Sequence, residues 1–218
     1  MDIIGPVMVG PSSSHTAGAV KIGQISRKLL AEPVQQAEIC FHGSFLATGK
    51  GHGTDRALVA GLLGLAVDDE NIPNSFAIAA ERNLTFSIHG IDLGDAHPNT
   101  VKMKLTGESG RTLEIVAASI GGGQIRICEI DGLTANFCGE YPTLIVHNLD
   151  QPGHVTEVTS MLAHKSVNIA TMQLYRDSRG GNAVMVIECD QEVPQEAIRW
   201  LEHLEGIEKV TYLSLEES

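Results

Sequence analysis

The stretch TLIVHNLDQPGHV at residues 143–155 decides how the second part of the chain folds. Its first five residues form an apolar run that is typical of a buried strand, and the Asp-Gln-Pro-Gly segment at 150–153 is typical of a turn. The following residues, 155–164, have the apolar spacing of an amphipathic helix. The positions expected to face inward are Val155, Val158 and Leu162. A strand, a turn and a helix are thus predicted to follow one another directly.

The rest of the tail continues this alternation. Residues 167–175 and 183–189 have the composition of strands and are separated by a polar, glycine-containing loop. A helix is expected from Pro194 to Leu204, because proline is favoured near the start of a helix, and a last strand follows at 210–215. The order is βαββαβ, which is the ferredoxin-like arrangement.

The Gly-Glu-Tyr-Pro segment at 139–142 separates this unit from the residues before it. We therefore predict two domains, residues 1–140 and residues 143–218, and assign the chain to the α+β class. In the first domain, helices are expected at 14–31, 57–65 and 76–82, and strands at 37–42, 84–89, 100–105, 113–119 and 124–130. Thr54 is expected to cap the second helix.

Composition excludes several classes of function. The formal net charge of −12 repels phosphate backbones, and no stripe of Lys or Arg offsets it, so a nucleic-acid partner is not expected. No apolar run is long enough for a membrane helix, and the first residues do not have the pattern of a signal peptide. The four cysteines are scattered without metal-ligand spacing and are predicted to be buried free thiols of a cytoplasmic protein: Cys40, Cys128, Cys138 and Cys189.

A first candidate site is the run Gly10-Pro11-Ser12-Ser13-Ser14-His15-Thr16. It places hydroxyl groups, a histidine and free backbone N–H groups at the start of a helix, where a carboxylate gains charge-assisted hydrogen bonds. The alternative is an ordinary helix cap, but three serines and a histidine exceed what a cap requires.

A second candidate is the run Gly49-Lys50-Gly51-His52-Gly53-Thr54-Asp55. Its spacing does not match the phosphate-binding loops of nucleotide-binding proteins. What remains is a histidine flanked by glycines, which permit close approach of a ligand, while Lys50 and Asp55 can set the charge and orientation of His52. The alternative is a flexible surface turn.

Two weaker candidates follow later in the chain. His97-Pro98-Asn99 comes after a polar loop, and Ser119-Ile120-Gly121-Gly122-Gly123 ends a strand with three glycines, where no side chain blocks an approaching group. The alternative in each case is turn chemistry.

These four segments, in this order and spacing, resemble the β chain of the iron-sulfur-dependent bacterial L-serine dehydratases of the two-chain type. The tail from Thr143, with Asp150, Pro152 and Gly153, resembles an ACT regulatory domain. The resemblance implies that the first domain has the allosteric-substrate-binding fold found in some phosphoglycerate dehydrogenases. The family also has a short segment before the first motif, whereas this sequence begins directly at Asp2.

Single-chain members of that family carry a further domain whose cysteines hold a [4Fe-4S] cluster, and this sequence ends before any such domain. The resemblance therefore implies an α chain that carries the cluster, L-serine as the substrate, and self-association through the ACT domain.

Removal of the α-proton of serine needs a base with a pKa near neutrality, a role that histidine fills. His52 is the first candidate for this base, and His15 is the second candidate or a clamp for the carboxylate. The residues expected to bind the carboxylate are Ser12, Ser13, Ser14 and Thr16. The remaining residues expected to bind the substrate are Lys50, Gly51, Asp55, His97, Asn99, Gly121 and Gly122.

Two other functions are compatible with parts of the sequence. One is a non-catalytic amino-acid-sensing regulatory subunit, which would not require a histidine such as His52 among glycines. The other is catalysis with pyridoxal phosphate, for which Lys50 is the only plausible Schiff-base lysine.

Overall fold

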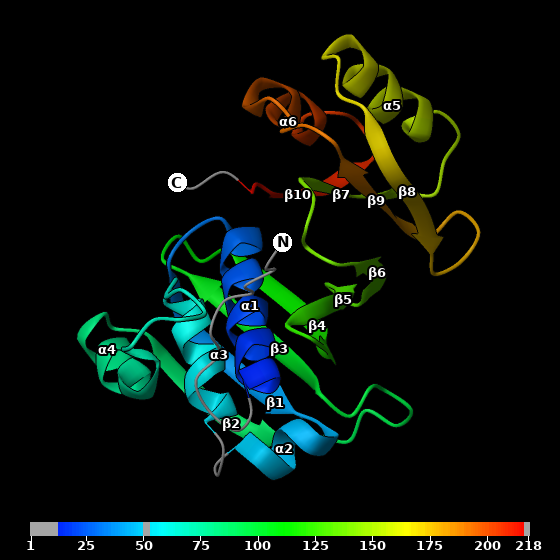
Figure 1. Ribbon diagram of the computed structural model, residues 1–218. Coiled ribbons are helices and arrows are strands. Elements are labelled where there is room, and N and C mark those ends of the chain that lie inside the picture. Colours follow the sequence, from blue (N-terminus) through cyan, green and yellow to red (C-terminus); the bar gives the residue numbers. More distant parts are fainter. Residues whose placement is uncertain (1–12, 50–52, 216–218) are drawn as a thin grey trace, which may run out of the picture.

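The computed structural model describes residues 13–49 and 53–215, which form two β-sheets with associated helices (Figure 1). The first sheet has the strand order β2-β1-β3-β4-β5-β6, and the second has the order β10-β7-β9-β8. The chain is therefore a mixed α/β protein.

The first sheet is formed by the first part of the chain. Its strands are β1 (Val34–Phe41), β2 (Thr85–Gly90), β3 (Thr100–Gly107), β4 (Thr112–Gly121), β5 (Gln124–Ile130) and β6 (Leu133–Phe137). Only β1 and β2 are parallel to each other, and the other neighbours are antiparallel. The helices of this part are α1 (Ser13–Leu30), α2 (Gly43–Gly49), α3 (Thr54–Leu62), the short 3₁₀ helix η1 (Ile72–Asn74) and α4 (Ser75–Glu81).

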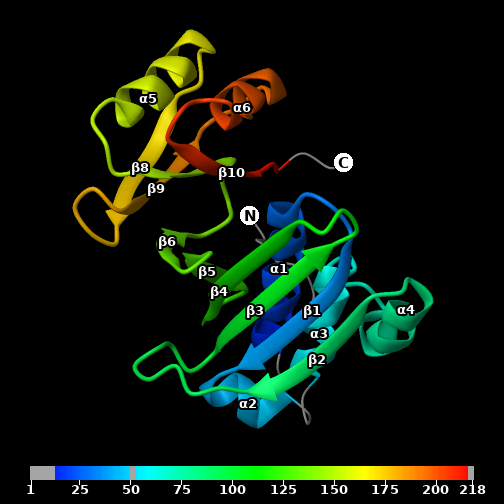
Figure 2. The same cartoon turned by 180° about the vertical axis from the view of Figure 1, so that it is seen from behind.

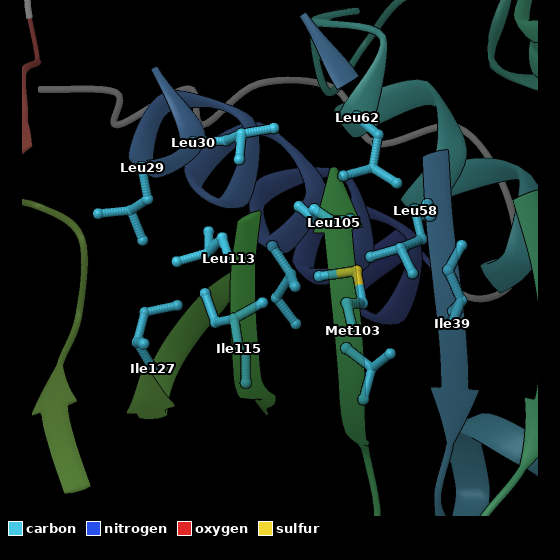
Figure 3. Close-up of a cluster of buried hydrophobic side chains, with 14 of the residues drawn as sticks. Leu29, Leu30, Ile39, Leu58, Leu62, Met103, Leu105, Leu113, Ile115 and Ile127 are labelled. Carbon is cyan, nitrogen blue, oxygen red and sulfur yellow. The ribbon is translucent and has the colours of Figure 1, made fainter. Parts of the chain in front are cut away.

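Helices α1 and α3 cover one face of this sheet, as seen from the two sides in Figures 1 and 2. They pack against each other closely because glycines lie at their crossing. A Cβ atom on Gly61 of α3 would lie 2.1 Å from the carbonyl oxygen of Val20 in α1. Apolar side chains of both helices and of β1, β3, β4 and β5 fill the core beneath them (Figure 3).

Most of the helices and strands expected in the first part are confirmed within a few residues, and three differences have local causes. Residues 43–49, for which no helix was expected, form α2, because Phe45 is fully buried and packs edge-on against Phe41 at 5.8 Å between ring centroids. The expectation that Thr54 caps α3 is wrong, because Gly53 (φ 76°) is the N-cap and Thr54 is a buried residue of the helix itself. Strand β6 was not expected at all.

The second part has the predicted βαββαβ order. Its elements are β7 (Thr143–Leu149), α5 (His154–His164), β8 (Ile169–Arg176), β9 (Asn182–Cys189), α6 (Gln195–Glu202) and β10 (Ile207–Leu213). On α5, Val158 and Leu162 are buried as expected, but Val155 is 40% exposed. His154, which is 7% exposed, takes the buried position in the first turn, and Val155 lies at the margin of the apolar stripe.

The second sheet is covered on both faces. Helices α5 and α6 pack on one face, and the other face contributes to the same buried cluster as the core of the first part. The residues that it contributes are Ile145, Val184, Val186 and Leu213. Polar contacts accompany this packing: Lys209 Nζ of β10 donates a hydrogen bond to the carbonyl oxygen of Thr112 at 3.1 Å and pairs with Asp131.

This shared core predicts the effect of one truncation. Ile145→Ala is expected to lower the free energy of unfolding by about 2 to 5 kcal/mol, because a fully buried aliphatic side chain leaves a cavity between the two sheets. Urea denaturation followed by circular dichroism measures the loss. Val155→Ala, at an exposed position, serves as the control and is expected to change stability by less than about 0.5 kcal/mol. Equal stabilities for the two variants would contradict the packing.

None of the helices in the described part of the chain combines the length and apolar character needed to cross a bilayer.

Candidate functional site

One edge of the first sheet collects the segments that the sequence singles out. Strands β1 and β2 end there and β3 begins there, as the pairing of Phe41 with both Gly90 and Val101 shows. Strand β4 turns into β5 at the same edge. We call this the site edge, and define it by Phe41, Gly90, Thr100, Ser119 and Gln124. Helix α2 lies next to it (Figure 2).

The N-termini of α1 and α3 both lie at the site edge. Near the start of α1, Gly18 lies against Ser119. Further along, Gln24 of α1 donates a hydrogen bond to the carbonyl oxygen of Leu65, just beyond the end of α3, at 2.7 Å. Val20 of α1 lies against Gly61 of α3, and Gln24, one turn further along α1, reaches Leu65, one turn further along the chain from Gly61. The helices are therefore parallel, and both start at this edge. Free N–H groups at a helix start carry partial positive charge, which attracts an anion. The first turn of α1 contains no acidic residue, whereas Asp55 in the first turn of α3 opposes this attraction there.

Several of the predicted site residues cannot be placed in this arrangement. Ser12, Lys50, Gly51 and His52 lie outside the described residues, and so do the side chains of Ser13, Ser14 and His15. The backbone of residues 13–15 is the first turn of α1, and Thr16 in the same turn is half-buried. The structure thus brings the backbone of residues 13–16, the described part of the first motif, to the site edge.

The start of α3 shows capping chemistry. Asp55 Oδ1 accepts a hydrogen bond from the backbone N–H of Arg56 at 2.8 Å. The guanidinium of Arg56 in turn stacks over the ring of Phe76, 4.9 Å from its centroid. These contacts anchor the helix start to α4, and the predicted role of Asp55 beside His52 stays a prediction.

His97 and Asn99 lie in the loop that enters β3. His97 is exposed, and its Nδ1 accepts a hydrogen bond from the backbone N–H of Asn99 at 3.2 Å. The Thr100 hydroxyl donates to the carbonyl oxygen of His97 at 2.6 Å. The contacts of His97 are therefore those of a turn, and they hold Asn99 at the site edge.

The hairpin between β4 and β5 leaves open space at the site edge. Gly121 (φ 96°) and Gly122 (φ 62°) both have left-handed backbone conformations, which favour glycine. A side chain at either position would meet no atom of the described residues within 4 Å. The two glycines therefore leave room for an approaching group.

Ser119 begins the run that ends with the three glycines, but only Gly121 and Gly122 of that run were predicted to bind the substrate. Its side chain is fully buried, and its backbone N–H donates a hydrogen bond to the carbonyl oxygen of Asn99 at 3.0 Å. Among the described residues, neither Ser119 Oγ nor Asn99 Oδ1 has a hydrogen-bond partner, although both atoms are buried. In the sequence, Ser119 stands two residues before the first of three consecutive glycines.

The four cysteines are not gathered into one group in the described structure. All four are free thiols, and burial raises the pKa of each, that of Cys189 to about 11. Metal-bound cysteine is the thiolate, which a raised pKa disfavours. The part of the chain that the structure describes contains no group of three His, Cys, Asp or Glu side chains placed to hold a metal ion.

One groove of the described surface lies away from the site edge. Its volume is about 830 Å³, and it runs between the end of α1 and α6, lined among others by Arg27, Lys28, Glu202 and Tyr212. None of the predicted site residues lines it.

Comparison with known proteins agrees with the sequence motifs. The family model described as the serine dehydratase beta chain matches residues 2–89, which include the first two motifs. A Bacillus subtilis (strain 168) protein named "Probable L-serine dehydratase, beta chain" is 39% identical over 213 residues, covering 98% of this chain and 96% of that protein. The "L-serine dehydratase, beta chain" of Peptoniphilus asaccharolyticus is 38% identical over 195 residues, covering 89% and 88%.

A more distant similarity extends to a larger enzyme. The D-3-phosphoglycerate dehydrogenase of Bacillus subtilis is 30% identical over 201 residues, which cover 90% of this chain but 37% of that protein. The two beta-chain relatives match over nearly their whole length as well as over nearly all of this chain. The chain therefore belongs to the family of serine dehydratase beta chains.

Proposed function

We propose that the chain is the β subunit of an L-serine dehydratase and acts together with an α chain that carries a [4Fe-4S] cluster. The reaction is the loss of water from L-serine, after which the aminoacrylate tautomerises and hydrolyses to pyruvate and ammonia. The observation that carries this proposal is the site edge, where two helix N-termini, a glycine hairpin and two unpartnered polar groups meet. The names of the two beta-chain relatives support it.

The two sheets correspond to the two proposed domains. Residues 1–140 would be the substrate-binding domain with the allosteric-substrate-binding fold, and residues 143–218 would be an ACT domain through which the chain self-associates. The similarity to a D-3-phosphoglycerate dehydrogenase over 90% of this chain supports both assignments. The βαββαβ order of the second part supports the ACT assignment.

Within the site, we assign the carboxylate of serine to the start of α1, with Ser12, Ser13, Ser14 and Thr16 around it. His52 is the proposed base that removes the α-proton, and His15 is the second candidate or a carboxylate clamp. The other proposed contacts to the substrate are Lys50, Gly51, Asp55, His97, Asn99, Gly121 and Gly122.

The cluster is assigned to the α chain, because the four thiols of this chain are dispersed and their pKa values are raised. Expulsion of the hydroxyl group is therefore left to the partner. Four free thiols also support a reducing compartment, and we place the reaction in the cytoplasm.

Reconstitution tests the proposal. The purified chain is expected to be colourless and inactive, and addition of an anaerobically prepared α chain is expected to produce pyruvate from L-serine. Pyruvate is measured by a coupled assay, and the α chain alone is the control. Visible iron-sulfur absorbance with stoichiometric iron in the isolated chain would sink the assignment of the cluster, and an inactive, cluster-loaded complex would sink the proposed function.

A further inference from the structure

Asn99 and Ser119 face each other across β3 and β4. Thr100 is paired with Ala118 in antiparallel register, so the preceding residue of one strand lies opposite the following residue of the other. The hydrogen bond of 3.0 Å from Ser119 N–H to the Asn99 carbonyl oxygen confirms this. Side chains that are directly opposite on antiparallel strands lie on the same face of the sheet, with their Cβ atoms roughly 4.5 to 5.5 Å apart.

That face is the one covered by α1. Ser119 Oγ would lie 2.1 Å from a Cβ atom on Gly18, so α1 approaches the serine at a position without a side chain. The hydroxyl is therefore buried against the backbone of α1 at Gly18, in the second turn of the helix. The two oxygen atoms, Ser119 Oγ and Asn99 Oδ1, lie below the same helix start that favours an anion.

Ser119 differs from the other fully buried serines of the described chain. Ser26 donates a hydrogen bond to the carbonyl oxygen of Ile22 at 2.7 Å, and Ser75 donates to that of Arg56 at 2.8 Å. Ser119 is equally buried but has no partner among the described residues. A buried polar group without a partner is costly and calls for a specific explanation.

The chemistry of Asn99 Oδ1 and Ser119 Oγ points to a positively charged hydrogen-bond donor as their partner. An amide oxygen only accepts hydrogen bonds, a hydroxyl oxygen can accept one as well, and an ammonium group donates up to three. In an α-amino acid, the ammonium and the carboxylate are attached to the same carbon atom. A ligand whose carboxylate lies at the start of α1 would therefore bring its ammonium group within reach of the sheet beneath.

We propose that Asn99 Oδ1 and Ser119 Oγ bind the α-ammonium group of the amino-acid substrate and thereby select an amino acid over a hydroxy acid. This inference rests on the proposed function, and it adds a role for Asn99 and a binding residue, Ser119. The pair recognises the amino group, and the helix start recognises the carboxylate.

The first experiment compares two ligands in the assembled enzyme. In Ser119→Ala, the KM for L-serine is expected to rise about 10- to 100-fold, because a hydrogen bond to a charged group is lost. The inhibition constant of 3-hydroxypropanoate, which is serine without its amino group, is expected to stay within about threefold. Ser26→Ala is the matched control, a buried serine on α1 away from the site edge, and should change neither value.

The second experiment tests the sign of the charge that Asn99 faces. Asn99→Leu is expected to raise the KM for L-serine as Ser119→Ala does. Asn99→Asp places a carboxylate there, which attracts an ammonium group and repels an anion. It is therefore expected to weaken 3-hydroxypropanoate at least tenfold more than L-serine.

Several outcomes would overturn the inference. These are an unchanged KM in an active Ser119→Ala enzyme, a parallel loss of serine and 3-hydroxypropanoate in that variant, and equal losses of both ligands in Asn99→Asp. In each of these outcomes the wild-type complex still deaminates serine. If the proposed function were wrong, the wild-type complex itself would be inactive, so the two failures are distinguishable.

Discussion

Replacing His52 by alanine in the assembled enzyme is expected to lower turnover about 10²- to 10⁴-fold, the usual contribution of a general base. The KM for L-serine is expected to change little, because a base acts on the α-proton only in the transition state. Steady-state kinetics of pyruvate formation measure both quantities. Retention of the cluster absorbance in the variant complex shows that assembly is intact.

Two further histidine variants decide between the candidates for the base. His203→Ala is the control, because this histidine lies at the end of α6 and its Nδ1 contacts the carbonyl oxygen of Arg199. His15→Ala is expected to raise the KM if His15 clamps the carboxylate. If His15→Ala abolishes turnover while His52→Ala leaves it intact, the base is His15 and our first assignment is wrong.

Gly61→Ala is expected to lower the free energy of unfolding by about 3 kcal/mol or more. The added methyl group would lie 2.1 Å from the carbonyl oxygen of Val20, so α1 and α3 would have to move apart over the core that they cover. The higher helix propensity of alanine recovers only about 1 kcal/mol. Urea denaturation followed by circular dichroism measures the difference.

A substitution at Gly110 serves as the control that distinguishes the cost of this steric clash from the cost of backbone strain. Gly110 has a φ of 86°, and a side chain there would meet no described atom within 4 Å. Gly110→Ala is therefore expected to cost about 1 to 2 kcal/mol, the cost of a left-handed backbone for a residue with a Cβ atom. A loss for Gly61→Ala no larger than that for Gly110→Ala would show that the helices adjust without strain.

The helices and strands were predictable where apolar spacing is regular, as in α1 and α5. Helix α2 was not, because a segment that begins and ends with glycine has low helix propensity, and it forms because Phe45 is buried against Phe41. The exposed Val155 illustrates a further limit. Apolar periodicity identifies the stripe of α5 that faces the sheet. Which residue at the margin of that stripe is buried depends on how the helix packs on the sheet.

The candidate site was predictable as separate motifs and not as an arrangement. Nothing in the spacing of the chain shows that Gly18 and Ser119, about a hundred residues apart, are in contact. Ser119 Oγ is buried without a hydrogen-bond partner among the described residues because α1 lies against it and Asn99 lies opposite it on the neighbouring strand. Composition alone does not predict this arrangement. The close packing of α1 and α3 likewise depends on glycines that are far apart in the sequence, Gly23 and Gly61.

The parallel course of α1 and α3 has a consequence for which ligands reach the site edge. Two positive helix ends attract an anion only over short distances, roughly within a turn of each helix. The whole chain, with its formal net charge of −12, repels anions over a Debye length of roughly 8 Å at physiological ionic strength. A zwitterion has no net charge and is therefore not repelled by the chain. A dicarboxylate is repelled before it comes close enough to the helix ends to be attracted by them. We therefore expect the net charge of this chain to favour the approach of a zwitterion over that of a dicarboxylate before any binding group makes contact.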